Sequence, residues 1–230
     1  MSEPCHGCVT YALAMRTLVL ASLFILACRS SSQRHDENGH LAHRFEDADA
    51  WAARFEDPKR EAWQKPAEVI ASLALSPNAK IADIGSATGY FPVRIAKALP
   101  KSRVYGVDVE SSMVDYLNKR AEQEQLSNLS SHLAEFADAK IPEPVDLILM
   151  VNTYHHIEAR PDYFKKLKNS LKPGGRLAII DFTRKSKMGP DSAEKMPPEQ
   201  VEAELKEAGY KLLESQSFLP EQYFLVFGSQ

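Results

Sequence analysis

Apolar residues recur along this chain with two different periods. Short apolar runs rich in Ile, Val and Leu alternate with segments whose apolar residues are three or four positions apart. The runs predict strands at about 80–85, 103–108, 129–134, 145–151 and 177–182, and a closing hairpin at 210–218 and 222–228. Helices are predicted between them at about 89–99, 112–126, 160–171 and 197–208. This alternation predicts an α/β domain with a mostly parallel sheet and one antiparallel strand near the C-terminus.

The first strand leads into a turn of small residues. Residues 81–90 read I-A-D-I-G-S-A-T-G-Y, so an apolar run carrying Asp83 turns through Gly85 and Gly89 into an amphipathic helix. Small residues let a ligand approach the backbone, and the free N–H groups of the helix favour a negatively charged group there. Asp108 ends the second strand, roughly 20 residues past the turn. These features predict a unit that binds a nucleoside.

The glycine spacing distinguishes between nucleosides. A dinucleotide fold requires G-x-G-x-x-G, but the second and third of these positions are Ala87 and Tyr90, so an NAD-dependent reductase is the least favoured alternative. Asp83, Gly85, Ala87 and Gly89 instead form D-x-G-x-A-x-G. This pattern resembles motif I of the class I S-adenosylmethionine (SAM) methyltransferases, [DE]-x-G-x-G-x-G, with Ala in place of the middle Gly.

Other landmarks follow in the order that this resemblance requires. G-V-D at 106–108 is followed by Ser111 and Met113, V-D-L-I-L-M at 145–150 is a buried strand led by an acid, and L-K-P-G-G at 171–175 is a helix-to-strand turn. W-Q-x-P at 63–66, Y-H-H at 154–156 and L-P-E-Q-Y-F-L-V-F at 219–227 are similar to a bacterial subgroup related to the ubiquinone and menaquinone C-methyltransferases. A His of that subgroup's pattern is replaced here by Glu194 and another by Tyr223, so a function that needs either His does not carry over.

The resemblance implies a Rossmann-like, doubly wound sheet of seven strands ordered 3-2-1-4-5-7-6, with SAM as cofactor. In such proteins the acid at the end of strand two holds the ribose hydroxyls, and an acid after strand three faces the adenine; here Glu135 and Asp138 both qualify. The residues assigned to the cofactor are Asp83, Gly85, Ala87, Gly89, Asp108, Glu135, Asp138 and Asn152. An N-terminal segment often covers the cofactor, so we expect residues 41–75 to form a helical lid in which Arg60, Trp63 or Gln64 reaches a ligand. The alternative is that its aromatic residues only pack against the sheet.

The segment after strand four carries the candidate catalytic residues. Tyr154, His155 and His156 follow the C-terminal end of that strand, the edge that faces the ligand in open α/β sheets. A His there suits proton transfer, but a structural role beneath the cofactor is the competing interpretation. Methyl transfer depends mainly on positioning and desolvation, so a base is needed only when the acceptor must lose a proton. A metal site is not predicted, because adjacent residues rarely chelate together and no third ligand is evident.

Composition limits the substrates. The chain has 230 residues, 44% of them hydrophobic, and a net charge of −3, so it lacks the basic surface typical of nucleic-acid enzymes. The predicted acceptor is a small molecule, and no nucleic-acid partner is expected. All three cysteines lie in the first 28 residues, which leaves the folded domain without a disulfide or a thiolate metal site.

The first 40 residues form a separate segment, and the methyltransferase domain is expected at 41–230. An apolar run at 18–27 is too short to span a membrane but suits a signal-peptide core, and I-L-A-C at 25–28 resembles a lipobox with Cys28 as the acylated residue. Residues 29–40 read as a disordered tether. Residues 15–28 therefore predict membrane attachment, whereas a true start at Met15 or a misassigned N-terminus leaves a cytoplasmic enzyme. Because SAM is made in the cytosol, a non-catalytic SAM-binding or scaffold lipoprotein is a further alternative.

Overall fold

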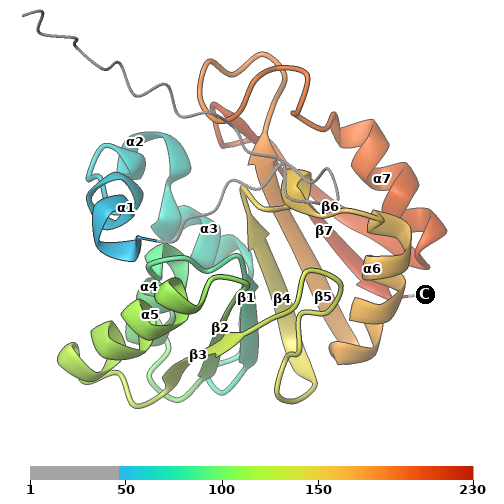
Figure 1. The fold of residues 1–230 in the computed structure, drawn as a ribbon. Helices are drawn as coiled ribbons and strands as arrows, with labels where there is room; N and C mark the ends of the chain where they lie inside the picture. Colours follow the sequence, from blue (N-terminus) through green and yellow to red (C-terminus); the bar gives the residue numbers. More distant parts are fainter. Residues whose placement is uncertain (1–46, 230) are drawn as a thin grey trace, which may run out of the picture. The chain divides into compact units, whose positions relative to one another are not determined.

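A computed structural model describes residues 47–229, which form one sheet covered by helices on both faces (Figure 1). The strands are β1 (Lys80–Ile84), β2 (Arg103–Asp108), β3 (Leu129–Leu133), β4 (Val145–Val151), β5 (Leu171–Phe182), β6 (Tyr210–Gln216) and β7 (Gln222–Ser229). Their order is β3-β2-β1-β4-β5-β7-β6, with β7 antiparallel to both neighbours and the first five strands parallel. The predicted fold class and strand order are confirmed.

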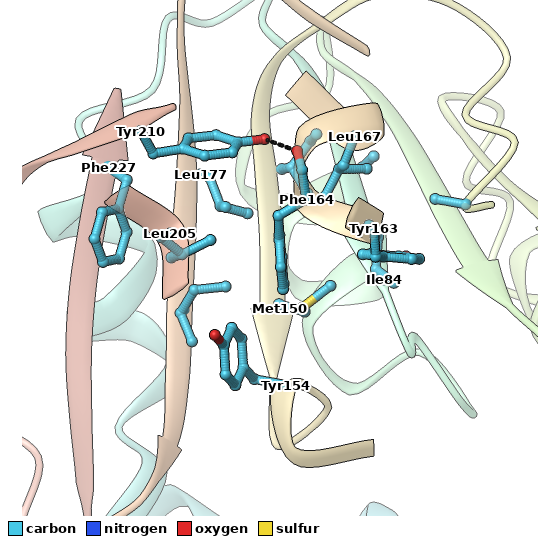
Figure 2. Close-up of a cluster of buried hydrophobic side chains, with 14 of the residues drawn as sticks. Ile84, Met150, Tyr154, Tyr163, Phe164, Leu167, Leu177, Leu205, Tyr210 and Phe227 are labelled. Atoms are coloured by element: carbon cyan, nitrogen blue, oxygen red, sulfur yellow. Dashed lines mark hydrogen bonds between the residues drawn. The ribbon is translucent and has the colours of Figure 1, made fainter. Parts of the chain in front are cut away.

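Each face of the sheet has its own apolar core because side chains alternate along the strands. On one face, Ile148 and Met150 of β4 pack with helices α6 (Arg160–Leu167) and α7 (Pro198–Glu207) (Figures 1 and 2). On the other, Leu147 and Leu149 pack with α3 (Pro66–Ser72), α4 (Tyr90–Ala98) and α5 (Ser111–Gln123). Both faces of the central strands are therefore buried, and the polar side chains that a ligand could reach lie at the strand ends.

Two local predictions are corrected by the structure. The L-K-P-G-G segment does not end a helix: after α6 comes a short 3₁₀ turn (Lys168–Ser170), and β5 already begins at Leu171. Gly174 has φ +76°, and the pairing between β4 and β5 shifts register between Val145 and Leu147, so this segment is a bulge within the strand. Helix α5 begins at Ser111, one residue before its predicted start. Its N-cap is Glu110, which makes no side-chain cap, and the N–H of Glu110 donates to Asp108.

The N-terminal part of the described chain is helical, in three pieces. These are α1 (Ala48–Phe55), α2 (Arg60–Gln64) and α3. Pro58 lies between the first two, and Pro66 begins α3 at a position where its missing N–H costs no helical hydrogen bond. Lys65, between α2 and α3, has φ +44°, a left-handed conformation that separates the two helices. Gln64, the last residue of α2, contacts Gln222, which lies opposite Phe182 at the C-terminal end of β5.

The predictions made for residues 1–40, including the signal-like run, Cys28 and the tether, lie outside the described residues and stay predictions. Within residues 47–229, no helix combines the length and the apolar character needed to cross a bilayer.

Candidate functional site

The turn between β1 and α4 brings three strands together. Gly85 has φ +72°, and both its N–H and that of Ser86 donate to the carbonyl of Val107 on β2 (2.8 and 3.2 Å). A Cβ at Gly85 would lie only 2.2 Å from Oγ1 of Thr153, the second residue after β4. Glycine is therefore required at this point for conformation and for space. The turn lies at the C-terminal edge of the sheet, where open α/β folds bind their ligands.

Asp108, at the end of β2, is held by the same turn. Its Oδ2 accepts from the N–H of Ala87 at 2.8 Å, and its Oδ1 accepts from the N–H of Glu110 at 3.0 Å. Burial raises the pKa of this carboxyl, and the backbone donors, led by Glu110, oppose that rise. The two N–H groups fix the carboxylate, while each oxygen keeps a further lone pair. A fixed carboxylate with spare acceptor capacity beside a glycine turn fits the two hydroxyls of a ribose.

Asp83 is the second acid of the turn and is 4% exposed. Burial raises its pKa well above the ordinary value, the charge of Asp108 adds to the rise, and Arg60 on α2 opposes it. Burial in turn lowers the pKa of Arg60 to about 10. An ammonium group of a ligand would be favoured beside Asp83, whereas a second carboxylate would not.

Ala87 stands where the family motif has its middle glycine and adopts a left-handed conformation. Its φ is +45°, a left-handed conformation that costs an L-residue roughly 1–2 kcal/mol. Its N–H nevertheless donates to Asp108, so the turn keeps its geometry at the expense of some strain.

We expect Ala87→Gly to raise the free energy of unfolding by about 0.5–1 kcal/mol, because the released strain exceeds the extra backbone entropy of glycine. Denaturant unfolding measures this change, and calorimetry should show undiminished affinity for S-adenosylhomocysteine (SAH). Ala74→Gly, at φ +46° and outside the turn, is the matched control for stability alone. A destabilised Ala87→Gly protein would contradict the assignment of strain.

Helix α2 reaches the site through a chain of polar side chains. Arg60 donates to Oε1 of Gln64 from Nε (2.8 Å) and Nη2 (2.5 Å). Nε2 of Gln64 donates to Oε1 of Gln222 on β7 (3.3 Å), and Nε2 of Gln222 donates to Oδ1 of Asn152 at the end of β4 (2.6 Å). Trp63 packs on Phe182 at the end of β5, with ring centroids 5.7 Å apart. Of the three residues that the lid hypothesis names, Trp63 and Gln64 contact strand ends, and Arg60 is bonded to Gln64.

The same N-terminal segment is fixed to α4 and α5. The guanidinium groups of Arg60 and Arg94 lie 3.7 and 3.8 Å from the ring centre of Tyr90, at the start of α4. Glu56 forms ion pairs with Arg94 and Arg120 (3.5 and 2.8 Å). Tyr90 occupies the position at which a dinucleotide fold requires its third glycine, and its side chain is needed here for this contact.

The two histidines after β4 differ in environment. Nδ1 of His155 lies 2.8 Å from Oδ2 of Asp181, and both side chains are at most 5% exposed. Asp181 therefore fixes Nδ1 as the protonated ring nitrogen and leaves the lone pair on Nε2. His156 is exposed and its ring centre lies 4.1 Å from that of His155.

Tyr154 points away from this edge into the core. It is fully buried and stacks on Phe164 at 5.1 Å (Figure 2). Its hydroxyl donates to Oε2 of Glu204 at 2.6 Å, and Arg160 binds the same carboxylate. Burial is the main cause of a strongly raised pKa at Tyr154. This environment favours a structural role for Tyr154.

The two acids considered for adenine lie after β3. Glu135 is exposed and pairs with Lys140, whereas Asp138 pairs with Lys166 at 2.9 Å and accepts from the N–H of Lys140. Hydrogen bonding to Lys166 lowers the pKa of Asp138. Glu135 comes two residues after Leu133, which lies opposite Asp108 in the sheet register. Of the two acids, Glu135 is thus nearer in sequence to the strand end that faces Asp108.

A family profile described as a methyltransferase domain matches residues 75–220, which is more than half of the chain. The chain belongs to the class I SAM-dependent methyltransferases. This confirms the resemblance found in the sequence, and SAM is the cofactor that the family and the fit of Asp108 and its turn indicate. The closer relation to the ubiquinone and menaquinone C-methyltransferases stays a prediction.

Individual relatives agree with this membership. A SAM-dependent methyltransferase from Aquifex aeolicus superposes with a TM-score of 0.72 at 26% identity, over 79% of this chain and 97% of that one. The malonyl-[acyl-carrier protein] O-methyltransferase of Priestia megaterium is 29% identical over 44% of this chain and 36% of its own length. The erythromycin 3''-O-methyltransferase of Saccharopolyspora erythraea is 31% identical over 53% of this chain and 41% of its own length. The alignment with such curated methyltransferases covers only about a third of their length.

Sequence reasoning missed three contributors to the site. The sequence patterns assign Gln222 and Asp181 only to strands and give Thr153 no role. The one available signal was position, because Asp181 and Thr153 both lie at or just beyond the C-terminal end of a strand. Residues 47–229 contain no cluster of His, Cys, Asp and Glu suited to a metal ion.

Proposed function

We propose that this protein transfers a methyl group from SAM to a small-molecule acceptor. The observation that carries the proposal is the Asp108 carboxylate, fixed by the N–H groups of Ala87 and Glu110 next to the Gly85 turn. A pyrophosphate coenzyme fits this arrangement less well, because Ala87 donates its N–H to Asp108 and Tyr90 replaces the third glycine.

Exposed apolar side chains beside Asp108 support an adenosine ligand. Val109 follows Asp108, Leu133 lies opposite it, and Phe136 belongs to the segment after β3; they are 36%, 52% and 75% exposed. Within residues 47–229 these three are large apolar residues left exposed at or just beyond a strand end, and adenine would cover apolar surface there. Glu135 is the acid placed to accept from the adenine amino group in this proposal.

The residues of this chain contribute positioning and proton transfer. SAM supplies a methyl group already activated by the sulfonium. Trp63 packs on Phe182 at the end of β5, and in this proposal the two rings shield that edge from water, which strengthens polar interactions inside it. His155, oriented by Asp181, holds Nε2 available to accept a proton from an acceptor hydroxyl or amine.

The acceptor is proposed to be small and neutral or weakly charged. The net charge of −3 gives no attraction for polyanions. Relatives named for their reactions methylate oxygen on erythromycin and on a malonyl-carrier protein, and nitrogen on phosphoethanolamine. They support methyl transfer in general and leave the acceptor of this chain open.

Calorimetric titration of the full chain with SAM, SAH and NADH tests the proposal. We expect binding of SAM and SAH and none of NADH. Transfer of labelled methyl from SAM to a panel of small phenols, carboxylic acids and amines then tests turnover. Binding of NADH in preference to SAM would overturn the proposal, and SAM binding without turnover of any acceptor would favour the scaffold alternative.

We expect His155→Gln to lower the turnover of the best acceptor in that panel about 100-fold while leaving SAH affinity within twofold, because it removes the base but not the cofactor contacts. His132→Gln, on β3 and bonded to Ser130, is the matched control and should leave turnover unchanged. Unchanged turnover in a folded His155→Gln protein would assign His155 a structural role.

A further inference from the structure

The polar chain from α2 to β4 has a fixed direction. The oxygen and nitrogen of an amide are alike in shape, so neighbouring groups decide which way each amide points. Arginine carries only donors. Because Nε and Nη2 of Arg60 both point at Gln64, the oxygen of Gln64 must face Arg60.

This orientation propagates along the chain. With its oxygen toward Arg60, Gln64 presents its NH₂ group to Oε1 of Gln222, and Gln222 presents its NH₂ group to Oδ1 of Asn152. Gln64 is 0% and Gln222 3% exposed, so water has little access to supply the hydrogen bonds that a reversed amide would lack. Each amide is therefore held one way round, and the oxygen of Asn152 is occupied.

Asn152 consequently offers its NH₂ group, which makes no hydrogen bond to any residue between 47 and 229. The residue has φ +55°, a left-handed conformation that Asn adopts more readily than most other L-residues. Its backbone N–H donates to Ile180 on β5, which fixes the main chain. The end of β4 thus carries an oriented hydrogen-bond donor.

We propose that Asn152 binds an oxygen of the SAM carboxylate, and that Arg60, Gln64 and Gln222 are positioning residues that keep its NH₂ group turned toward it. The inference rests on the proposed function. Because β1 lies between β2 and β4, the ends of β2 and β4 are about 10 Å apart at the usual strand spacing. If the ribose of SAM binds Asp108 on β2, the amino-acid part of SAM can extend across the Gly85 turn to Asn152.

The charges at the site indicate where the ammonium and the carboxylate of the amino-acid part of SAM bind. Asp83, on the intervening strand β1, and Asp108 are two buried acids whose proximity already raises the pKa of Asp83, so a third carboxyl group is disfavoured beside them. The NH₂ group of Asn152, which follows the next strand β4, can donate a hydrogen bond to a carboxylate. Its neighbour Thr153 lies against Gly85, so Asn152 is close to the turn. The carboxylate is also the group of SAM that needs a donor.

The direction of the change in SAH affinity distinguishes a donor role of Asn152 from an acceptor or a purely structural role. Asn152→Asp keeps the shape but replaces the outward donor with a charged acceptor, so it should repel a carboxylate. Gln64→Glu touches no ligand in this proposal, yet it offers an oxygen to Gln222 and so reverses both following amides. The oxygen of Asn152 would then point outward. Gln123→Glu, exposed on α5, is the control for added charge.

Calorimetry of the full-length wild type and the three variants with SAH and 5′-methylthioadenosine, which lacks the amino-acid arm, tests the proposal. Asn152→Asp and Gln64→Glu should each weaken SAH about tenfold or more and leave methylthioadenosine within twofold, while Gln123→Glu changes neither. Thermal unfolding confirms that each variant is folded.

Retained or increased SAH affinity in Asn152→Asp would overturn the assignment of a donor. Equal losses for SAH and methylthioadenosine would overturn the assignment to the carboxylate, and an unaffected Gln64→Glu protein would overturn the directional chain. Failure of the wild type to bind SAH would instead refute the proposed function.

Discussion

Gly85→Val is expected to abolish measurable SAH binding, with at least a 100-fold loss of affinity. The first added carbon would lie 2.2 Å from Oγ1 and 2.6 Å from Cγ2 of Thr153. Since a branched side chain is also strained at φ +72°, the turn must move. The movement displaces the N–H groups bonded to Val107, and with them the N–H of Ala87 that orients Asp108. Calorimetric titration with SAH measures the loss.

Gly174→Val separates the effect on the site from general strain. Gly174 has nearly the same φ, +76°, but no atom lies within 4 Å of the position of its Cβ. We expect this variant to be somewhat less stable, yet to bind SAH as the wild type does. If both variants lose affinity alike, or if Gly85→Val binds normally, the turn is not the cofactor site.

Asp108→Ala is expected to weaken SAH by about 1.5–3 kcal/mol, or roughly 10- to 150-fold, because a charge-assisted acceptor for the ribose hydroxyls is lost. The N–H groups of Ala87 and Glu110 also lose their partner, so the turn loosens. Titration with SAH and with adenosine should show a similar loss for both, since both carry the ribose.

Asp146→Ala provides the matched comparison. Asp146 is also a strand acid that accepts from a backbone N–H, that of Lys80 at 2.7 Å, and it pairs with Lys172. It belongs to the start of β4, at the opposite edge of the sheet. Its removal should lower the free energy of unfolding but not SAH affinity. A loss of SAH affinity as large as that of Asp108→Ala would show that the effect is not specific to the ribose contact.

The sequence determined the framework of this protein because the framework depends on local and periodic signals. Buried parallel strands give apolar runs, surface helices give three- and four-residue spacing, and a glycine turn followed by an acid specifies a ribose site. Seven strands, their order through the family resemblance, and the cluster of Asp83, Gly85 and Asp108 were therefore predictable. At the L-K-P-G-G segment the local turn signal was misleading, because pairing with β4 extends strand β5 back to Leu171.

The tertiary structure alone decided which side chains meet at the strand ends. Gln64 and Gln222 are 158 positions apart, and His155 and Asp181 are 26 apart, so no repeating pattern in the chain relates them. The tertiary structure also decided the direction in which each side chain points. Tyr154 and His155 both follow β4 closely, but Tyr154 points into the core toward Glu204. Residue types and spacing specify which groups are available at an edge. Only the packing of distant segments fixes which of them are paired and buried, and which still have a donor or a lone pair to offer to a ligand.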